Sequence, residues 1–550
     1  MLSPASIFRS TLNWWGNSNS IGSSVPFCLE NNRKICLYLA VASVCLWNVY
    51  AIWRVFTLAH VPDEIWFYIV ALENYKSESF NPFFAENKFA YGGVWFAIYH
   101  LMICFSELFS PVSYSSISFL DTSSLLGENF EYTSIAPLLL MRALSLFSIN
   151  VVLFLYIRRL RQGEIWAFFS LIFFLSFPML YWGGKLASPD VLSCVILFLG
   201  IWSFRRHKRR AYIFFGAALA VKLSALPLFA LLVIFHLITA IYFFVSSASF
   251  LDSPNIAKSH IYYQRQKLFL DLYVGLTLCL LVFFVCNLYA IAHTEEYLKN
   301  IVFFTSAFAD EDVFLSWSNF FGGAKARLGN ENGQLWDLVN PGGFFYWSSS
   351  ALVVVLAFFI SFYFSKSKIN PIFIACAFFA TFVFVVRQPA FGWNWFPFII
   401  IFPLLLSFVK INRISIILLI LLCALSFFVN FPHMRREISL VYQHDKILSE
   451  FLARRSELVA EVNAFLADLG VERRPRILNL IDIGAVYPNS ESYNDSFWRH
   501  KDNIRAGDLI LLGDRVRNYH EGLLLELQTK FEYSEARWGS IAGIYILNRR

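Results

Sequence analysis

Long apolar runs recur along most of the chain and are separated by short polar stretches. A run of about 20 apolar residues is long enough to cross a bilayer as a helix. We therefore predict about eleven transmembrane spans, at residues 35–57, 136–157, 164–183, 186–204, 211–224, 225–247, 269–292, 347–365, 370–386, 394–409 and 412–431. The run at 91–109 is apolar but short, and it predicts an interfacial or re-entrant helix. The predicted fold class is a polytopic α-helical membrane protein.

Both ends of the chain depart from this pattern. Residues 1–34 are polar and rich in Ser and Asn, and they predict a cytoplasmic tail. From residue 432 the composition becomes that of a soluble domain, with helical spacing over 437–469 that stops at Gly470. Three short apolar stretches then predict strands, at 476–483, 508–512 and 541–547. The predicted domains are therefore the tail at 1–34, a transmembrane domain at 35–431 and a small α/β domain at 432–550.

The basic loops indicate the orientation. With the predicted spans, all of them fall on the same side as the N-terminus, at 158–161, 205–210, 258–267, 366–368 and 410–413. Short loops rich in Lys and Arg are retained in the cytoplasm. The acidic loops 58–135 and 293–346 and, with an odd number of spans, the C-terminal domain are then extracytoplasmic. We prefer a bacterial inner membrane, with the endoplasmic reticulum as the alternative.

Composition agrees with a membrane protein and narrows the partners. The chain of 550 residues is 57% hydrophobic and 15% charged, whereas soluble domains carry about 25% charged residues. Acidic and basic residues are nearly balanced in the C-terminal domain, which argues against nucleic acid as a partner. Most of the nine cysteines lie in apolar runs, with neither a disulfide pattern nor zinc-type spacing.

The outer face limits the chemistry, because it has neither ATP nor nucleotide sugars. Group transfer there needs a donor carried in the membrane, such as a polyprenyl-phosphate sugar. Its phosphate leaves without a proton, so one carboxylate suffices as the base that deprotonates the acceptor hydroxyl. Asp63 and Glu64 lie just past the first span and are the candidates. The alternative is that this pair only favours the N-terminus of the helix that follows.

Cations near the outer face are candidates for holding the leaving phosphate. Arg142 lies inside an apolar run, Lys222 lies between two apolar stretches, and Arg387 begins a tight aromatic turn. Lys185 and Asp190 flank a short outer turn and are assigned to substrate binding. For each residue the alternative is structural: an interface anchor, a snorkelled side chain or the start of a helix.

The sequence leaves a divalent-metal site as an alternative, and it assigns no cofactor. The acidic run 310–312 offers oxygen ligands for a divalent metal, although a solvated acidic loop is the favoured interpretation. His60, His100 and His293 have no spacing typical of a zinc site.

Three stretches resemble the GT-C superfamily of polyprenyl-phosphate-sugar-dependent glycosyltransferases, most closely the protein O-mannosyltransferase and lipid A aminoarabinose transferase type. They are Pro62-Asp63-Glu64, Phe177-Pro178 with Ala187-Ser188-Pro189-Asp190, and Gly216-Ala-Ala-Leu-Ala-Val-Lys222. The first outer loop is also similar to the lipid-linked mannosyltransferases of glycolipid-anchor assembly.

The resemblance implies that Asp63 is the base and that Lys222 and Arg387 hold the lipid phosphate. The chain departs from the family at Ala90-Tyr91-Gly92-Gly93, where a Pro-Pro-Leu-Tyr type of stretch is usual, and after Arg387. Tyr91 is included among the substrate-binding candidates.

The predicted function is an inverting glycosyltransferase of the membrane. It moves a sugar from a polyprenyl-phosphate donor to a hydroxyl of a glycan, lipid or protein acceptor. One alternative is a polysaccharide polymerase or ligase, for which Lys325, Arg327 and Asp337 in the later outer loop would matter instead of Asp63. Another is a transporter of a lipid-linked saccharide, although the one short pair of apolar stretches, around Lys222, has no second copy of the kind expected in a transporter.

Overall fold

The structure of the protein is a computed structural model. It describes residues 27–57, 67–68, 71–72, 74–76, 93–109, 114, 136–177, 180–181, 187–204, 207–248, 257–295, 297–299, 351–365, 402–453, 455–471, 475–480, 491–492, 504–513, 527–538 and 541–549.

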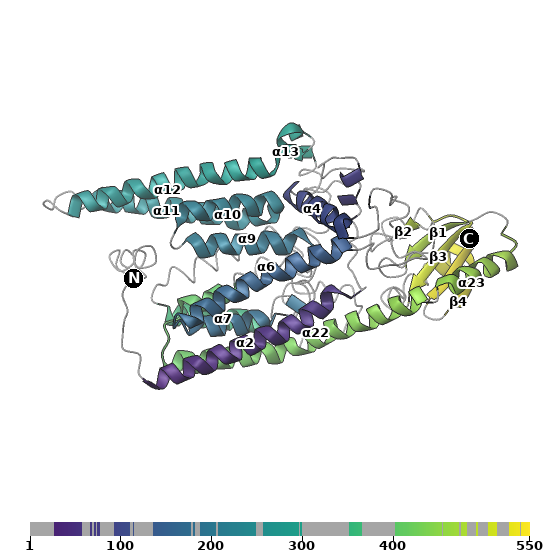
Figure 1. Cartoon of the computed structure of the whole chain (residues 1–550), viewed down its shortest axis with the longest axis horizontal. Helices are drawn as coiled ribbons and strands as arrows, with labels where there is room; N and C mark the ends of the chain where they lie inside the picture. Colours follow the sequence, from purple (N-terminus) through teal and green to yellow (C-terminus); the bar gives the residue numbers. More distant parts are fainter. Residues whose placement is uncertain are drawn as a thin grey trace.

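Helices form most of the described chain (Figure 1). Those that precede the sheet are α2 (Phe27–Val55), α4 (Gly93–Phe109), α6 (Ala136–Arg161), α7 (Trp166–Leu175), α9 (Pro189–Phe204), α10 (Lys208–Val221), η4 (Leu223–Ala225), α11 (Leu226–Ala248), α12 (Ala257–Cys286), α13 (Leu288–Ala292), α19 (Ala351–Phe364), η7 (Leu406–Phe408), α22 (Arg413–Ala453) and α23 (Arg455–Asp468).

Four of these helices are long and apolar enough to cross a membrane, over Arg33–Val55, Ala136–Arg161, Lys267–Cys286 and Arg413–Pro432. The predicted class, a helical integral membrane protein, is therefore confirmed, but the predicted number of about eleven spans is not. The expected spans at 164–183, 186–204, 211–224 and 347–365 correspond to apolar helices of 10, 16, 14 and 14 residues. The expected span at 370–386 lies outside the described residues.

The long helices lie along the long axis of the molecule (Figure 1). Basic residues stand at the start of α10 and α22, in the first part of α2 and α12, and at the end of α6. Arg33 of α2 reaches the turn at Gly163 that follows α6, which brings two of these helix ends together. We call this end of the bundle, marked by Arg33, Arg161, Lys208, Lys267 and Arg413, the basic end. The opposite, far end carries α4, α13 and the sheet (Figure 1).

Polar pairs join the helices inside an otherwise apolar bundle. Asn48 of α2 and Asn150 of α6 exchange two amide hydrogen bonds of 2.9 and 2.8 Å. The Ser176 hydroxyl lies 2.5 Å from that of Ser426 on α22. Lipid tails are as apolar as leucine, so helices in a bilayer associate through such bonds and through close packing. These contacts fix which helix lies beside which.

The packing of α10 against α12 shows how close two backbones come. A Cβ placed at Gly216 would lie 2.4 Å from the carbonyl oxygen of Cys279, and one at Gly275 would lie 2.3 Å from the ring of Tyr212. Both distances are below any ordinary contact, so only glycine fits at these two positions. The two glycines therefore set the spacing of this helix pair.

Helix α22 carries the chain from the bundle to the C-terminal sheet (Figure 1). It runs for 41 residues without an end at 432, the point at which the composition changes, and Pro432 lies inside it. The expected helix at 437–469 is thus the last part of α22 followed by α23. Gly470, with φ of +67°, comes just after α23 ends at Asp468, as its position in the sequence predicted.

The C-terminal sheet has the strand order β2-β1-β3-β5-β4. Strands β1 (Arg476–Leu480), β2 (Glu491–Ser492) and β3 (Asp508–Gly513) are parallel, while β5 (Ile541–Arg549) is antiparallel to β3 and to β4 (Phe531–Trp538). Along β3, Leu509 and Leu511 pack with α23, and Ile510 and Leu512 face a second cluster on the opposite side. All three predicted strands are confirmed. The strands β2 and β4 were not predicted, because β2 is very short and β4 is an edge strand rich in charged residues.

Candidate functional site

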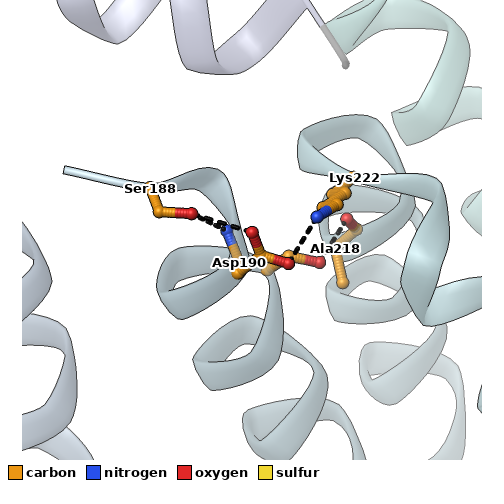
Figure 2. A network of polar contacts seen from close by, with 5 residues as sticks. Ser188, Asp190, Ala218 and Lys222 are labelled. Carbon is orange, nitrogen blue, oxygen red and sulfur yellow. Dashed lines mark hydrogen bonds and ion pairs between the residues drawn. The ribbon is translucent and has the colours of Figure 1, made fainter. Parts of the chain in front are cut away.

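Asp190 and Lys222 lie together at the far ends of two neighbouring helices, although 32 residues separate them in the chain (Figure 2). Asp190 stands in the first turn of α9, and Lys222 follows the last residue of α10. The backbone of Lys222 is extended, with φ −157° and ψ 132°, so the helix ends here before η4 and α11 begin. The Lys222 Nζ atom lies 2.5 Å from Asp190 Oδ1.

This ion pair is almost removed from solvent. The side chain of Asp190 is 3% exposed and that of Lys222 is 12% exposed. The Ser188 hydroxyl donates to Asp190 Oδ2 over 2.8 Å, so both carboxylate oxygens have a partner (Figure 2). A buried pair is costly to break from one side, because the remaining charge stays buried without its counter-ion. The sequence predicted both residues as site candidates, and the structure brings them together.

Arg142 is fully buried in α6. Two hydrogen bonds of its guanidinium go to main-chain oxygens. Its Nη1 donates to the carbonyl oxygens of Val55 and Thr57, over 3.2 and 2.8 Å. These carbonyls belong to the C-terminus of α2, which lacks helical partners and carries a partial negative charge. The guanidinium therefore holds the end of α2 immediately before the first outer loop begins.

Described parts of that outer loop pack against the far end of the bundle. Phe67, Tyr68, Ala71 and Leu72 form a buried cluster with α4, with Leu138 and Met141 of α6 and with Ala187. Ala187 precedes Asp190 by three residues. Residues 67–68 and 71–72 of the outer loop therefore lie in the same cluster as Ala187, close in the chain to the ion pair.

Glu107 of α4 binds a second part of the same loop. It accepts a hydrogen bond from the Tyr75 hydroxyl and another, of 2.9 Å, from the backbone N–H of Tyr114. The bond to Glu107 raises the pKa of Tyr75, because the hydroxyl would lose its proton beside a carboxylate. Glu107 thus ties both sides of the loop to α4.

The remaining predicted site residues, Asp63, Glu64, Tyr91, Lys185 and Arg387, lie outside the described residues, as does the acidic run 310–312. Asp63 is six residues after Thr57 and four before Phe67.

Some residues of this region were missed by the sequence analysis. Arg54 is 1% exposed in the last turn of α2, and its Nη1 lies 3.4 Å from the Thr57 hydroxyl. An arginine within an apolar run is the same signal that identified Arg142. Ser188 stood in one of the motifs but was given no role, and Glu107 gave no such signal, because a single glutamate near the end of a helix is common.

Metal ligands are not grouped in the part of the chain that the structure describes: no cluster of three His, Cys, Asp or Glu side chains occurs there. His100 lies against the ring of Tyr75, with ring centroids 4.9 Å apart. The described site therefore provides a buried ion pair, main-chain anchoring by arginine and aromatic packing.

The fold and the site define a polytopic helical membrane protein with a buried ion pair and a buried arginine at its far end. No family model matches the sequence, and no curated protein matches it. Similar solved structures include two of ArnT from Cupriavidus metallidurans. The one bound to undecaprenyl phosphate has a TM-score of 0.39 and 12% identity, over 92% of this chain and 97% of that chain. The apo structure has a TM-score of 0.37 with the same identity and coverage.

ArnT is a lipid A aminoarabinose transferase of the GT-C family, which is one of the types that the sequence motifs resemble. At this identity and TM-score, however, the similarity identifies neither the reaction nor the substrates of this chain.

Proposed function

We propose that the protein is an inverting glycosyltransferase that uses a polyprenyl-phosphate sugar at the far end of the bundle. The far end is then extracytoplasmic, the basic end is cytoplasmic, and about eleven spans cross the membrane, with a bacterial inner membrane preferred. The domains keep the proposed limits 1–34, 35–431 and 432–550, although the last two share helix α22. The acceptor is a hydroxyl group of a glycan, lipid or protein.

One observation supports this proposal: the described candidates Arg142, Asp190 and Lys222 lie at the same end of the bundle. Arg142 holds Thr57 before the Asp63-Glu64 stretch, and the cluster of Phe67 and Tyr68 holds the chain after it. The same cluster contains Ala187, beside the turn that leads to Asp190 and its partner Lys222. The described residues on both sides of the Asp63-Glu64 stretch thus lie at the same end of the bundle as the proposed phosphate-binding Lys222.

The reaction assigns a separate role to each group. Asp63, with Glu64 beside it to raise its pKa, takes the proton of the acceptor hydroxyl as that oxygen attacks the anomeric carbon. The bond from the anomeric carbon to the phosphate oxygen breaks, and the lipid phosphate leaves with the bonding electrons. Lys222 and Arg387 stabilise the charge that grows on the phosphate. Lys185, Asp190 and Tyr91 are proposed to contact the substrates.

Arg142 was a third candidate for the phosphate, but its hydrogen bonds favour a positioning role. Its Nη1 is bound to two carbonyl oxygens at the end of α2. By fixing that helix end it keeps the base-bearing loop in place, which affects transfer without contact to the donor.

The test measures thermal stabilisation of the purified protein by a panel of polyprenyl-phosphate sugars. We expect one donor to raise the melting temperature of the wild type and of Asp63→Asn, since the base is not needed for binding. The double variant Asp190→Asn/Lys222→Gln removes both charges but keeps hydrogen-bonding groups at both positions. It is expected to remain folded and to lose the stabilisation.

Transfer from the stabilising donor is then measured. Asp63→Asn is expected to abolish it with normal expression and folding. If every donor fails to stabilise folded wild-type protein, or if Asp63→Asn retains transfer, the proposal is wrong. In the latter case the polymerase or ligase alternative, with Lys325, Arg327 and Asp337, is favoured, and donor export without transfer favours a transporter.

A further inference from the structure

A group of charged side chains at the basic end takes no part in the proposed reaction. Asp271 of α12 is buried, with its side chain 9% exposed, and its Oδ1 accepts a bond of 2.7 Å from Nε of Arg209. The charges of Asp271 and Lys267 both act on the side chain of Lys208, the first residue of α10, and shift its pKa. We call Lys208, Arg209 and Lys267 the basic cluster. In the part of the chain that the structure describes, Asp271 is the carboxylate that pairs with Arg209 and acts on Lys208.

One carboxylate leaves this group with an excess of positive charge. Burial, with a further contribution from Lys267, lowers the pKa of Lys208 to about 8, although Asp271 acts in the opposite direction. The side chain of Arg209 is 46% exposed. Among the described residues its only hydrogen bond is the one from Nε, so its two terminal amino groups are open to a further acceptor. A guanidinium with open terminal groups binds a phosphate through two parallel bonds.

Buried packing holds the cluster in place. The Tyr212 hydroxyl lies 2.9 Å from Nδ1 of His236, and this bond joins α10 to α11 beneath Lys208. The ring of Tyr212 fits against Gly275 of α12. Three helices are therefore fixed to one another directly below the cations, and an anion would meet a site that needs little rearrangement.

The position of the cluster points to a lipid as the source of that anion. The sequence of α12 is rich in polar residues up to Lys267 and mostly apolar after it, so the cations stand where the polar part of the helix meets its apolar part. One to two turns further along α12, Leu270 and Tyr273 are 51% and 71% exposed, and Ile213 of α10 is 39% exposed. Cations followed by exposed apolar side chains match an anionic headgroup followed by acyl chains.

We propose that the basic cluster binds the headgroup of an anionic phospholipid in the leaflet at the basic end. The phosphate is held by Arg209 and Lys208, with Lys267 adding to the positive field. The acyl chains lie along Ile213, Leu270 and Tyr273. The site is at the opposite end of the bundle from the proposed transferase site, and it does not depend on that proposal.

The test is a titration followed by native mass spectrometry, with the full-length protein in neutral detergent. Phosphatidylglycerol is compared with phosphatidylcholine of the same acyl chains. A cation near the headgroup contributes a factor of about five in affinity. We therefore expect phosphatidylglycerol to bind more tightly to the wild type, and Lys208→Gln to weaken it by about fivefold.

A second variant is designed to test the cluster without leaving a buried charge that could prevent folding. Arg209→Gln alone would leave Asp271 buried without its partner, so it is combined with Asp271→Asn. This double variant keeps the net charge of the cluster but removes the guanidinium that is proposed to hold the phosphate, so it is also expected to weaken binding. Lys299→Gln is the matched control, because Lys299 lies beyond α13 at the far end, is 73% exposed and pairs only locally with Glu295. Its lipid preference is expected to equal that of the wild type.

Three results would overturn the proposal. The first is equal binding of the two lipids, and the second is a preference for phosphatidylglycerol that survives in both cluster variants. The third is thermal stabilisation by inorganic phosphate as large as that by the lipid, which would assign the site to a free anion.

Discussion

At the scale of single residues, the most informative feature is the burial of charge. Arg54, Arg142 and Asp190 are each at most 2% exposed, although the chain is apolar around them. Arg142 donates to main-chain carbonyls, Asp190 pairs with Lys222 and Ser188, and Arg54 lies 3.4 Å from the Thr57 hydroxyl. Because an uncompensated buried charge is costly, these partners are as important to the fold as the charges themselves.

The ion pair of Asp190 and Lys222 allows a direct test of this point. Lys222→Met leaves the carboxylate buried alone, so we expect a loss of about 3–5 kcal/mol in the free energy of unfolding. The double variant Asp190→Asn/Lys222→Gln has no charge to bury and is expected to recover most of that loss. Unfolding by SDS titration measures both. Equal losses for the single and the double variant would show that the charges are not coupled.

Lys208 gives the stability of the protein a dependence on pH. Its pKa is lowered to about 8 in the fold, mainly by burial, with Lys267 and His236 facing it beside Asp271. Between that value and the ordinary lysine value the unfolded chain binds more protons than the folded one, so stability rises with pH there. Below about pH 8 both states are protonated and the contribution is constant.

We expect the melting temperature in neutral detergent to rise from pH 8 to pH 10 and the rise to be smaller in Lys208→Met. Lys299→Gln serves again as the control from the far end. An identical rise in Lys208→Met would assign the pH dependence to other groups.

At the scale of elements, close approach and interruption of helices decide the architecture. Helix α10 meets α12 at Gly216 and Gly275 and then stops at Lys222, where the backbone becomes extended. The stop turns the chain into α11 and leaves the lysine beside α9. A longer α10 would carry Lys222 onto a different face and separate it from Asp190.

The contact at Gly216 leads to a prediction on helix pairing. Gly216→Ala places a methyl group 2.4 Å from the backbone of α12, which cannot move as a side chain can. We expect a loss of about 1–3 kcal/mol in the free energy of unfolding, as for overpacking elsewhere. In Gly93→Ala the added methyl would meet its nearest neighbours at 3.7 Å, so this control is expected to be near neutral. SDS titration compares the two, and similar stabilities would contradict the account of this packing.

At the scale of the whole molecule, the two ends of the bundle differ in charge and in content. The basic end collects the Lys- and Arg-rich helix termini, whereas the far end carries the ion pair, the packed outer loop and the sheet (Figure 1). Under the positive-inside rule this asymmetry predicts a cytoplasmic basic end.

Labelling of single cysteines tests this orientation. In a cysteine-free background, Gln162→Cys reports on the basic end and Glu295→Cys on the far end, since both positions are exposed. We expect a membrane-impermeant maleimide to label Glu295→Cys in intact cells and Gln162→Cys only in inverted vesicles. The reverse pattern would place the proposed site in the cytoplasm and exclude the donor chemistry.

The limits of prediction from sequence can be seen at particular positions. The apolar runs identified α2, α6 and α12 because their length alone exceeds what a soluble helix of this polarity requires. The boundary at 432 followed a real change of composition, yet the helix continues through it, because backbone hydrogen bonds do not depend on polarity. Strand β4 escaped notice because an edge strand need not alternate clearly.

The sequence carries local signals, namely hydrophobic periodicity, the placement of charges and turn residues. These signals were sufficient to predict the membrane class, the C-terminal α/β segment and the basic helix ends, and to nominate the candidate residues. Which of those residues meet is a matter of helix packing, and it depends on contacts between positions far apart in the chain. Only the tertiary structure joined Asp190 to Lys222, turned Arg142 towards the end of α2, and set Asp271 among three cations. A buried charge needs a partner in space, and linear spacing does not specify which one.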